Sequence, residues 1–226
     1  MFGLPFAREV LPFFVGALAL FGAPALLCWL LKKRRAAGVL LALAILSAGY
    51  MLYFFRDPPR TPPDDPRLVL AGADGRVMSV TRAVEKDFIK GPAVRISIFL
   101  SLFDVHINRA PIAGRVMALG YHPGKRYFTF QEKSSEYNQH STILIDGVET
   151  RCLVKQIVGP VARRVVYWLN LYQDVDAGER IGMMKFGSRL DMFLPAEDVE
   201  VLVQPGAKVQ SGLTPVARLL TPAGKN

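Results

Sequence analysis

Cysteine and histidine are scarce in this sequence. Its 226 residues include two cysteines, Cys28 and Cys152, and three histidines, all widely separated. This spacing predicts no disulfide and no metal site. Dense basic runs are also lacking outside Lys32–Arg35, and no nucleic-acid recognition motif occurs. The net charge of +9 is therefore interpreted as favouring an anionic lipid surface over nucleic acid.

Charge is absent from two long apolar segments, Val10–Leu31 and Ala36–Phe55, which flank the basic turn Lys32–Arg35. Each has about 20 residues, enough to cross a hydrocarbon core of about 30 Å as a helix. Residues 1–55 are therefore predicted to form a membrane helical hairpin. A signal peptide fits poorly, because the first run is too long and a second follows at once. The positive-inside rule places the basic turn in the cytoplasm and the rest of the chain outside, although a hairpin that inserts as a pair weakens this argument.

The remainder is predicted to be a connector and one domain. Residues 56–67 are rich in proline and suit a stiff spacer. Residues 68–226 show short Val, Ile and Leu runs between Gly, Pro and Asp turns, so we expect an α+β, β-rich fold with one mainly antiparallel β domain. Helical periodicity is weak, with Thr81–Lys86 a modest candidate. The strands are expected at 76–80, 94–102, 115–119, 142–145, 151–158, 165–171, 180–186, 190–194 and 199–203.

Polar residues with chemical potential gather in the stretch SLFDVHINRAP, directly after an apolar run. Alternation along a strand would place Asp104, His106 and Asn108 on one face. A lone histidine is more often structural, but three polar side chains on one face are less easily explained that way. Arg109 follows in the same stretch.

Two further stretches have ordinary explanations as turns. Asp74-Gly75 precedes a predicted strand, and Gly187-Ser188 lies between two apolar runs. The second also has a chemical interpretation. Glycine allows unusual backbone angles, and a serine hydroxyl can attack a neighbouring carbonyl when it is activated.

Taken in order, the stretches ADGRV, FDVHINRAP, ERIGMMKFGSRLDMFLP and VQPGAKVQSGLTPVARL resemble phosphatidylserine decarboxylase proenzymes of the short bacterial and archaeal form. The resemblance covers roughly residues 55–220. It implies a precursor that cuts itself at the Gly187–Ser188 bond into chains 1–187 and 188–226. These chains would remain together as a heterodimer.

The resemblance also implies the cofactor and the reaction. Ser188 would attack the carbonyl of Gly187, and elimination of the resulting ester would convert Ser188 into a pyruvoyl group. This group would form a Schiff base with phosphatidylserine and accept electrons as carbon dioxide leaves, the role of pyridoxal phosphate elsewhere. The product would be phosphatidylethanolamine, with neither pyridoxal phosphate nor a metal required.

Site residues follow from the same resemblance. Asp74 aligns with the aspartate that orients the base in self-cleavage, and His106 with a histidine of substrate binding and decarboxylation. Arg109 occupies the place where the longer enzymes have a second histidine, and arginine stays protonated. The longer enzymes also have an arginine in a later Asn-Glu-Arg stretch, where this chain reads Asn138-Gln139-His140. The resemblance therefore leaves either His106 or His140 as the candidate base. Arg109 and Asn108 are candidate substrate-binding residues.

The sequence is compatible with two functions. One is a membrane-anchored decarboxylase whose partners are phosphatidylserine and membrane lipids. The alternative is a membrane-tethered, non-catalytic β module for lipid binding or assembly. For the enzyme we expect the cell membrane, and substrate made on the cytoplasmic side favours the cytoplasmic leaflet.

Overall fold

A computed structural model describes residues 6–125, 127–129, 131, 134–160, 165–185 and 188–220. The chain divides into two compact units, residues 1–59 and 60–226. Each unit is described by itself.

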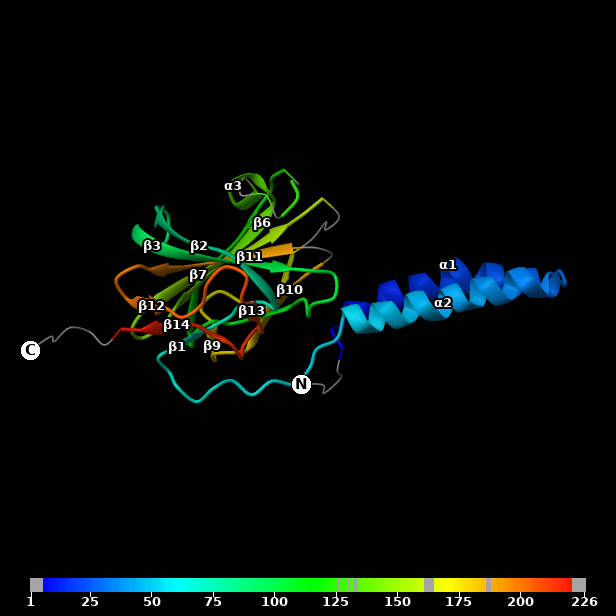
Figure 1. Ribbon diagram of the computed structural model, residues 1–226, viewed down its shortest axis with the longest axis horizontal. Coiled ribbons are helices and arrows are strands. Elements are labelled where there is room, and N and C mark those ends of the chain that lie inside the picture. The colour runs from blue at the N-terminus through cyan, green and yellow to red at the C-terminus, as the bar shows by residue number, and fades with distance from the viewer. Residues whose placement is uncertain are drawn as a thin grey trace, which may run out of the picture. The chain divides into compact units, whose positions relative to one another are not determined.

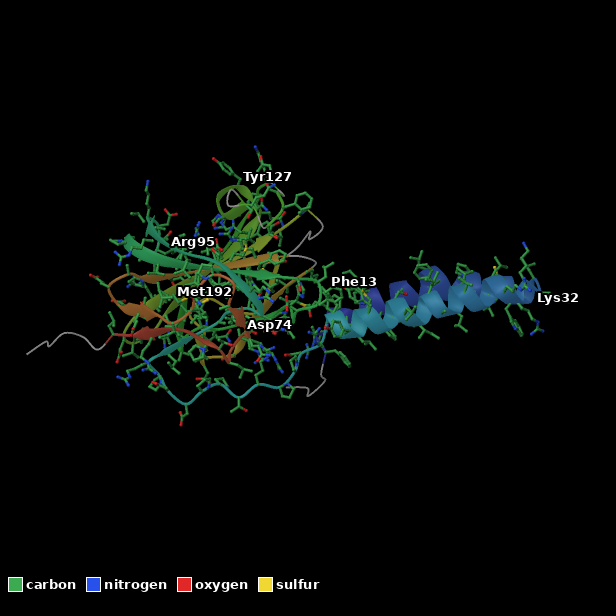
Figure 2. The ribbon with its side chains drawn as sticks, viewed as in Figure 1. Phe13, Lys32, Asp74, Arg95, Tyr127 and Met192 are labelled. Atoms are coloured by element: carbon green, nitrogen blue, oxygen red, sulfur yellow. The ribbon has the colours of Figure 1, made fainter. Side chains whose placement is uncertain are left out.

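The first unit is a pair of helices, α1 (Val10–Leu30) and α2 (Arg34–Phe54). A tight turn joins them, with Lys32 at φ 58° (Figures 1 and 2). Pro24 lies inside α1. At about 1.5 Å per residue, 21 residues extend about 31 Å, the thickness of a bilayer core.

The surface of the helix pair is apolar. Leu20, Leu46 and Ile45 are 66%, 69% and 62% exposed. Small residues are buried instead, as is common where membrane helices pack closely; they are Ala25, Ala37, Ala44 and Ala48. Both helices are long and apolar enough to span a membrane. Two such helices could anchor the chain, in agreement with the predicted hairpin.

The second unit contains fourteen strands among its described residues, with all pairings between named strands antiparallel (Figure 1). The main sheet has the order β13-β2-β3-β11-β7-β6-β5-β9. Its strands are β2 (Gly75–Glu85), β3 (Gly91–Leu100), β5 (Gly114–His122), β6 (His140–Asp146), β7 (Arg151–Val158), β9 (Asp174–Val175), β11 (Ser188–Pro195) and β13 (Lys208–Val209).

Two three-stranded sheets complete the unit, in the orders β1-β14-β12 and β4-β10-β8. A single short helix, α3 (Ser134–Tyr137), is present among the described residues of this unit. The strands of the small sheets are β1 (Leu68–Leu70), β4 (Ile107–Arg109), β8 (Val165–Tyr167), β10 (Arg180–Met184), β12 (Val199–Val201) and β14 (Pro215–Leu219).

The two faces of the main sheet differ in character. Even-numbered residues of β11 point into the larger apolar core, together with Ile96, Ile98 and Leu100 of β3. Met192 is one of them, and Figure 2 shows its place inside the unit. Odd-numbered residues of β11 point to the opposite face, because side chains alternate along a strand. We call these the core face and the outer face.

The predicted α+β, β-rich class is confirmed. The expected strand 151–158 is β7 with the same limits. The modest helix candidate Thr81–Lys86 is wrong, because residues 81–85 continue β2 in a long hairpin with β3. The expected strand 180–186 ends at Met184 in β10, and Phe186 lies outside the described residues.

Candidate active site

Ser188 is the first residue of β11, the strand at the centre of the main sheet between β3 and β7. It pairs with Leu100 on one side and Val158 on the other. The residue is completely buried on the core face, and its Oγ has no hydrogen-bond partner within the described part of the chain. A buried hydroxyl normally has a partner, so this one is available for another role. Gly187 itself lies outside the described residues.

His106 is also completely buried, just before β4. Its Nδ1 lies 3.0 Å from the backbone oxygen of Asp104. A carbonyl oxygen only accepts hydrogen bonds, so Nδ1 carries the hydrogen and Nε2 has the lone pair. The Asp104 carboxylate fixes the same turn by accepting from Ser101 N at 2.8 Å and Ser101 Oγ at 2.6 Å. The turn therefore holds His106 in a tautomer suited to accept a proton through Nε2.

The backbone brings His106 towards Ser188 from two directions. Leu100, paired with Ser188, comes six residues before His106 in the chain. Met184, four residues before Ser188, donates its N–H to His106 O at 3.2 Å. Strands β4 and β10 are antiparallel, with Asn108 opposite Gly182 and Ile107 opposite Met183. Continuing this register places His106 beside Met184, which is closer to Ser188 along the chain than Gly182 is.

Asn108 belongs to the same group. It is fully buried, and its Oδ1 accepts a hydrogen bond from Gln156 Nε2 at 2.7 Å. Gln156 Oε1 in turn accepts from Ser141 Oγ at 2.6 Å. Because Gln156 and Val158 are two residues apart on β7, they face the same way as Ser188. Asn108 therefore lies on the Ser188 side of the main sheet.

His140 is not brought to this side. It pairs with Ile157 of β7, which pairs with Arg189 of β11. Directly paired residues share a face, so His140 shares the outer face with Arg189, opposite Ser188. It stacks on His122, with ring centroids 4.7 Å apart. Burial lowers the pKa of His140 below its ordinary value, and the nearby His122 and Lys155 act in the same direction.

The outer face beside the candidate site contains a buried ion pair. Arg189 Nε lies 2.6 Å from Asp191 Oδ1, and both side chains are completely buried. Arg189 also donates to Ser97 Oγ at 2.9 Å, and Ser135 of α3 donates to the other oxygen of Asp191. These contacts anchor the beginning of β11 to β3 and to α3.

Asp74 is held by arginine. Arg60 Nη1 and Nη2 lie 2.6 and 2.8 Å from its two carboxylate oxygens, and Ser211 N donates to Oδ1 at 2.8 Å. Ser211 Oγ contacts the backbone oxygen of Ile107 at 3.3 Å, one residue from His106. Asp74 thus supports the segment of His106 indirectly. Gly75 beside it has φ +144°, and a Cβ there would lie 2.0 Å from the Phe99 oxygen.

Arg109 is buried near two glycines. Its Nη1 donates to the backbone oxygen of Gly178 at 3.0 Å. Its Cδ would lie 2.8 Å from a Cβ placed on Gly212. On β4 it is the immediate neighbour of Asn108 and so faces away from the Asn108 side. Among the residues that the structure describes, no cluster of three His, Cys, Asp or Glu side chains is placed to hold a metal ion.

Sequence reasoning missed Arg60, Ser211, Gln156 and Ser141. Gln156 left a signal, because with Lys155 it interrupts the apolar residues CLV and IV of β7. Arg60 left none, since it stands in a proline-rich stretch that reads as a solvated spacer. Its side chain is only 4% exposed.

A serine, a histidine and an amide, all buried at one end of an antiparallel sheet, define a site for nucleophilic chemistry. The family model described as "Phosphatidylserine decarboxylase" matches residues 48–217. The chain belongs to this family, and the prediction that it is an enzyme of the family is confirmed.

Curated relatives match three quarters or more of the chain. The chain is 37% identical to the phosphatidylserine decarboxylase proenzyme of Desulfotalea psychrophila over 218 residues, which cover 96% of this chain and 98% of the relative. It is 43% identical to the proenzyme of Symbiobacterium thermophilum over 215 residues, 94% and 95% of the two chains. The proenzyme of Carboxydothermus hydrogenoformans is 44% identical over 170 residues, 75% and 80%.

Proposed function

We propose that this chain is a precursor that cuts itself between Gly187 and Ser188 and then decarboxylates phosphatidylserine to phosphatidylethanolamine. The observation that carries the proposal is the buried Ser188 hydroxyl at the start of β11, without a partner among the described residues. In a member of this family, it lies where the chain would be cut.

In the proposed cleavage, His106 acts as the base. Its Nε2 takes the proton of Ser188 Oγ, while Oγ forms a bond to the carbonyl carbon of Gly187. The Gly187–Ser188 amide bond breaks, and the proton passes to the departing amine of residue 188. Elimination of the ester then leaves the Gly187 carboxylate and a dehydroalanine, which water converts to a pyruvoyl group with loss of ammonia.

The site fits a pyruvoyl group, because the group is made from Ser188 and needs little space beyond that of its side chain. The Oγ is not committed to any described hydrogen bond that the conversion would break. When present, the group supplies an electron sink for the departure of carbon dioxide. Leu100 and Val158 flank the position on the two neighbouring strands.

The two products are proposed to remain one folded unit. Chain 188–226 contributes β11 to the centre of the main sheet, with β3 and β7 of the first chain on either side. The Asp74–Ser211 hydrogen bond joins the same two chains. Cutting one peptide bond leaves these contacts intact.

Roles for the other predicted residues follow from their contacts. We assign Asn108 to the reaction site because it lies on the Ser188 side. The Gly178 hydrogen bond and the packing near Gly212 support a structural role for Arg109. The outer-face position of His140 supports His106 as the base.

The two helices are proposed to anchor the enzyme so that it works on lipid of the cytoplasmic leaflet. Their apolar surface supports the anchoring, and supply of substrate from the cytoplasmic side supports the leaflet. A single cysteine introduced at Thr61, in a Cys28→Ser background, tests the leaflet. Labelling by a membrane-impermeant maleimide in intact cells would place the connector outside and contradict this assignment.

Intact mass and a lipid assay test the proposed function together. Purified chain should give two fragments, and it should convert phosphatidylserine in mixed micelles to phosphatidylethanolamine. Ser188→Ala should remain one chain of 25.0 kDa without activity. Normal fragments from the Ser188→Ala protein would end the pyruvoyl proposal.

A further inference from the structure

Gln156 is an unusual residue for its position. Its side chain is completely buried on the core face of β7, opposite Leu190 of β11 and Ser141 of β6. Leu190 belongs to the apolar core. Burying an amide in such surroundings is costly unless its hydrogen bonds are satisfied.

Both ends of the Gln156 amide are satisfied in a fixed direction. Oε1 accepts from Ser141 Oγ at 2.6 Å, and Nε2 donates to Asn108 Oδ1 at 2.7 Å. Because Oδ1 of Asn108 accepts this hydrogen bond, the Nδ2 group of Asn108 points away from Gln156 and can donate elsewhere. Asn108 Nδ2 is buried and has no hydrogen-bond partner among the described residues.

Gly182 makes this arrangement possible. It pairs with Asn108 across β10 and β4. A Cβ at Gly182 would lie 3.1 Å from Gln156 Nε2 and 2.3 Å from the backbone oxygen of Val166. Any side chain there would displace strand β8 and crowd the amide that holds Asn108.

Gln156, which holds the Asn108 amide, lies near the reaction site. The Gln156–Leu190 pair is two positions along the strands from the Val158–Ser188 pair, about 7 Å on the same face. Ser188 Oγ is likewise buried and without a described partner. A donor beside a nucleophile can stabilise the negative oxygen that forms when the nucleophile attacks a carbonyl.

We propose that Gln156 is a positioning residue that, supported by Ser141, turns the Asn108 amide so that its N–H₂ group serves as a hydrogen-bond donor to the oxyanion formed during self-cleavage. This inference rests on the proposed function. In the step concerned, Ser188 Oγ bonds to the carbonyl carbon of residue 187, and the carbonyl oxygen gains the charge. His106 takes the Oγ proton and returns it to the amine nitrogen as the amide bond breaks.

Gln156→Leu tests the inference without adding charge. Leucine has a similar size but no hydrogen-bonding group, so Asn108 is free to rotate. We expect the half-time of self-cleavage, followed on gels after pulse-labelled synthesis into lipid vesicles, to lengthen at least tenfold. Loss of one oxyanion donor slows enzymes by about 10²- to 10³-fold. Cleavage of Gln156→Leu at the wild-type rate would overturn the proposal.

Gln156→Glu separates a positioning role from a purely structural one, because only a positioning role makes the cleavage rate depend on the ionisation of residue 156. An ionised carboxylate only accepts hydrogen bonds, so it would bind the N–H₂ group of Asn108. The Asn108 oxygen, which cannot donate, would then face Ser188. A protonated carboxyl can donate to Asn108 Oδ1 as glutamine does. Cleavage should therefore be slow at pH 9 and recover towards pH 6, whereas wild type should not speed up as the pH falls. A pH profile parallel to that of wild type would contradict the inference.

The control variant is Gln173→Glu, whose Oε1 accepts from Asn170 N in an exposed turn and would do so after the change. It should cleave at the wild-type rate at every pH.

Hydroxylamine, which cuts esters, identifies the slowed step. Because the proposed defect precedes the ester, hydroxylamine should release no extra fragments from Gln156→Leu. Extra fragments would show slow elimination and refute the oxyanion role, whereas an uncut wild-type chain would refute the proposed function itself.

Discussion

Arg60 donates hydrogen bonds to both carboxylate oxygens of Asp74, at 2.6 Å from Nη1 to Oδ1 and 2.8 Å from Nη2 to Oδ2. The side chains are only 4% and 10% exposed. Nη1 also reaches the backbone oxygen and the hydroxyl of Ser211, at 2.6 and 2.9 Å. Three segments far apart in the sequence therefore meet at one buried ion pair.

Arg60→Ala is expected to destabilise the domain strongly, because it leaves the Asp74 carboxylate buried without its counter-charge. Removing one partner of a buried pair costs about 3–5 kcal/mol. Urea unfolding of the uncut Ser188→Ala protein in detergent measures the change. Arg115→Ala is the matched control, since its pair with Asp174 is exposed and screened by solvent, so its loss should change the free energy of unfolding little. Equal effects of the two substitutions would contradict the buried role of Arg60.

Asp74→Asn should fold and process slowly. The amide keeps one oxygen for Arg60 or Ser211 N but cannot accept from both Nη atoms as the carboxylate does. The segment that supports Ile107, next to His106, would then be held less firmly. The fraction of cut chain on gels over time measures the effect. If Asp74 only stabilises the turn that it forms with Gly75, the Asp74→Asn protein should be cut almost normally, because asparagine also favours such turns.

His106→Ala should remain one chain, and His140→Ala should be cut normally. The reason is geometric: His140 lies on the outer face, whereas Ser188 and Asn108 lie on the core face. Denaturing gels of the two purified variants decide the matter. Blocked processing in His140→Ala, with cutting retained in His106→Ala, would instead identify His140 as the base.

Stability should fall as the pH drops below about 6.5, in part because of His140. Burial lowers its pKa in the folded domain below the ordinary value of 6.5, so the unfolded chain binds more protons in this range. The associated stability is present above pH 6.5 and is lost as the pH falls. We expect His140→Gln to show a smaller decrease of the urea midpoint between pH 7.5 and pH 5.5 than its parent. An unchanged decrease would show that other groups are responsible.

Much of the fold was predictable because its signals are local. The two uncharged runs of about 20 residues specify helices that could span a membrane. Short β-branched runs between turn residues specify strands, and β7 was predicted with its limits. The error at Thr81–Lys86 has a non-local cause, since those residues are strand only through their pairing with β3.

The candidate site was predictable only in part. The ordered motifs around Asp74, His106 and Ser188 identified the family. The predicted strand alternation does not apply to Asp104 and His106, because both lie before β4 begins at Ile107. Nothing local revealed Arg60 as the partner of Asp74, because the two meet through folding across 14 positions of the chain.

The sequence by itself determined the apolar hairpin, the β-rich domain and the Gly187-Ser188 pair as the candidate cleavage site, since each depends on composition or on neighbouring residues. Only the tertiary structure decided which histidine shares a face with Ser188, which amide Asn108 meets, and where the Asp74 charge is neutralised. The physical reason is strand register. A shift of one residue between β6 and β7 would move His140 to the other face, and register is set by packing across the whole sheet rather than by any segment alone.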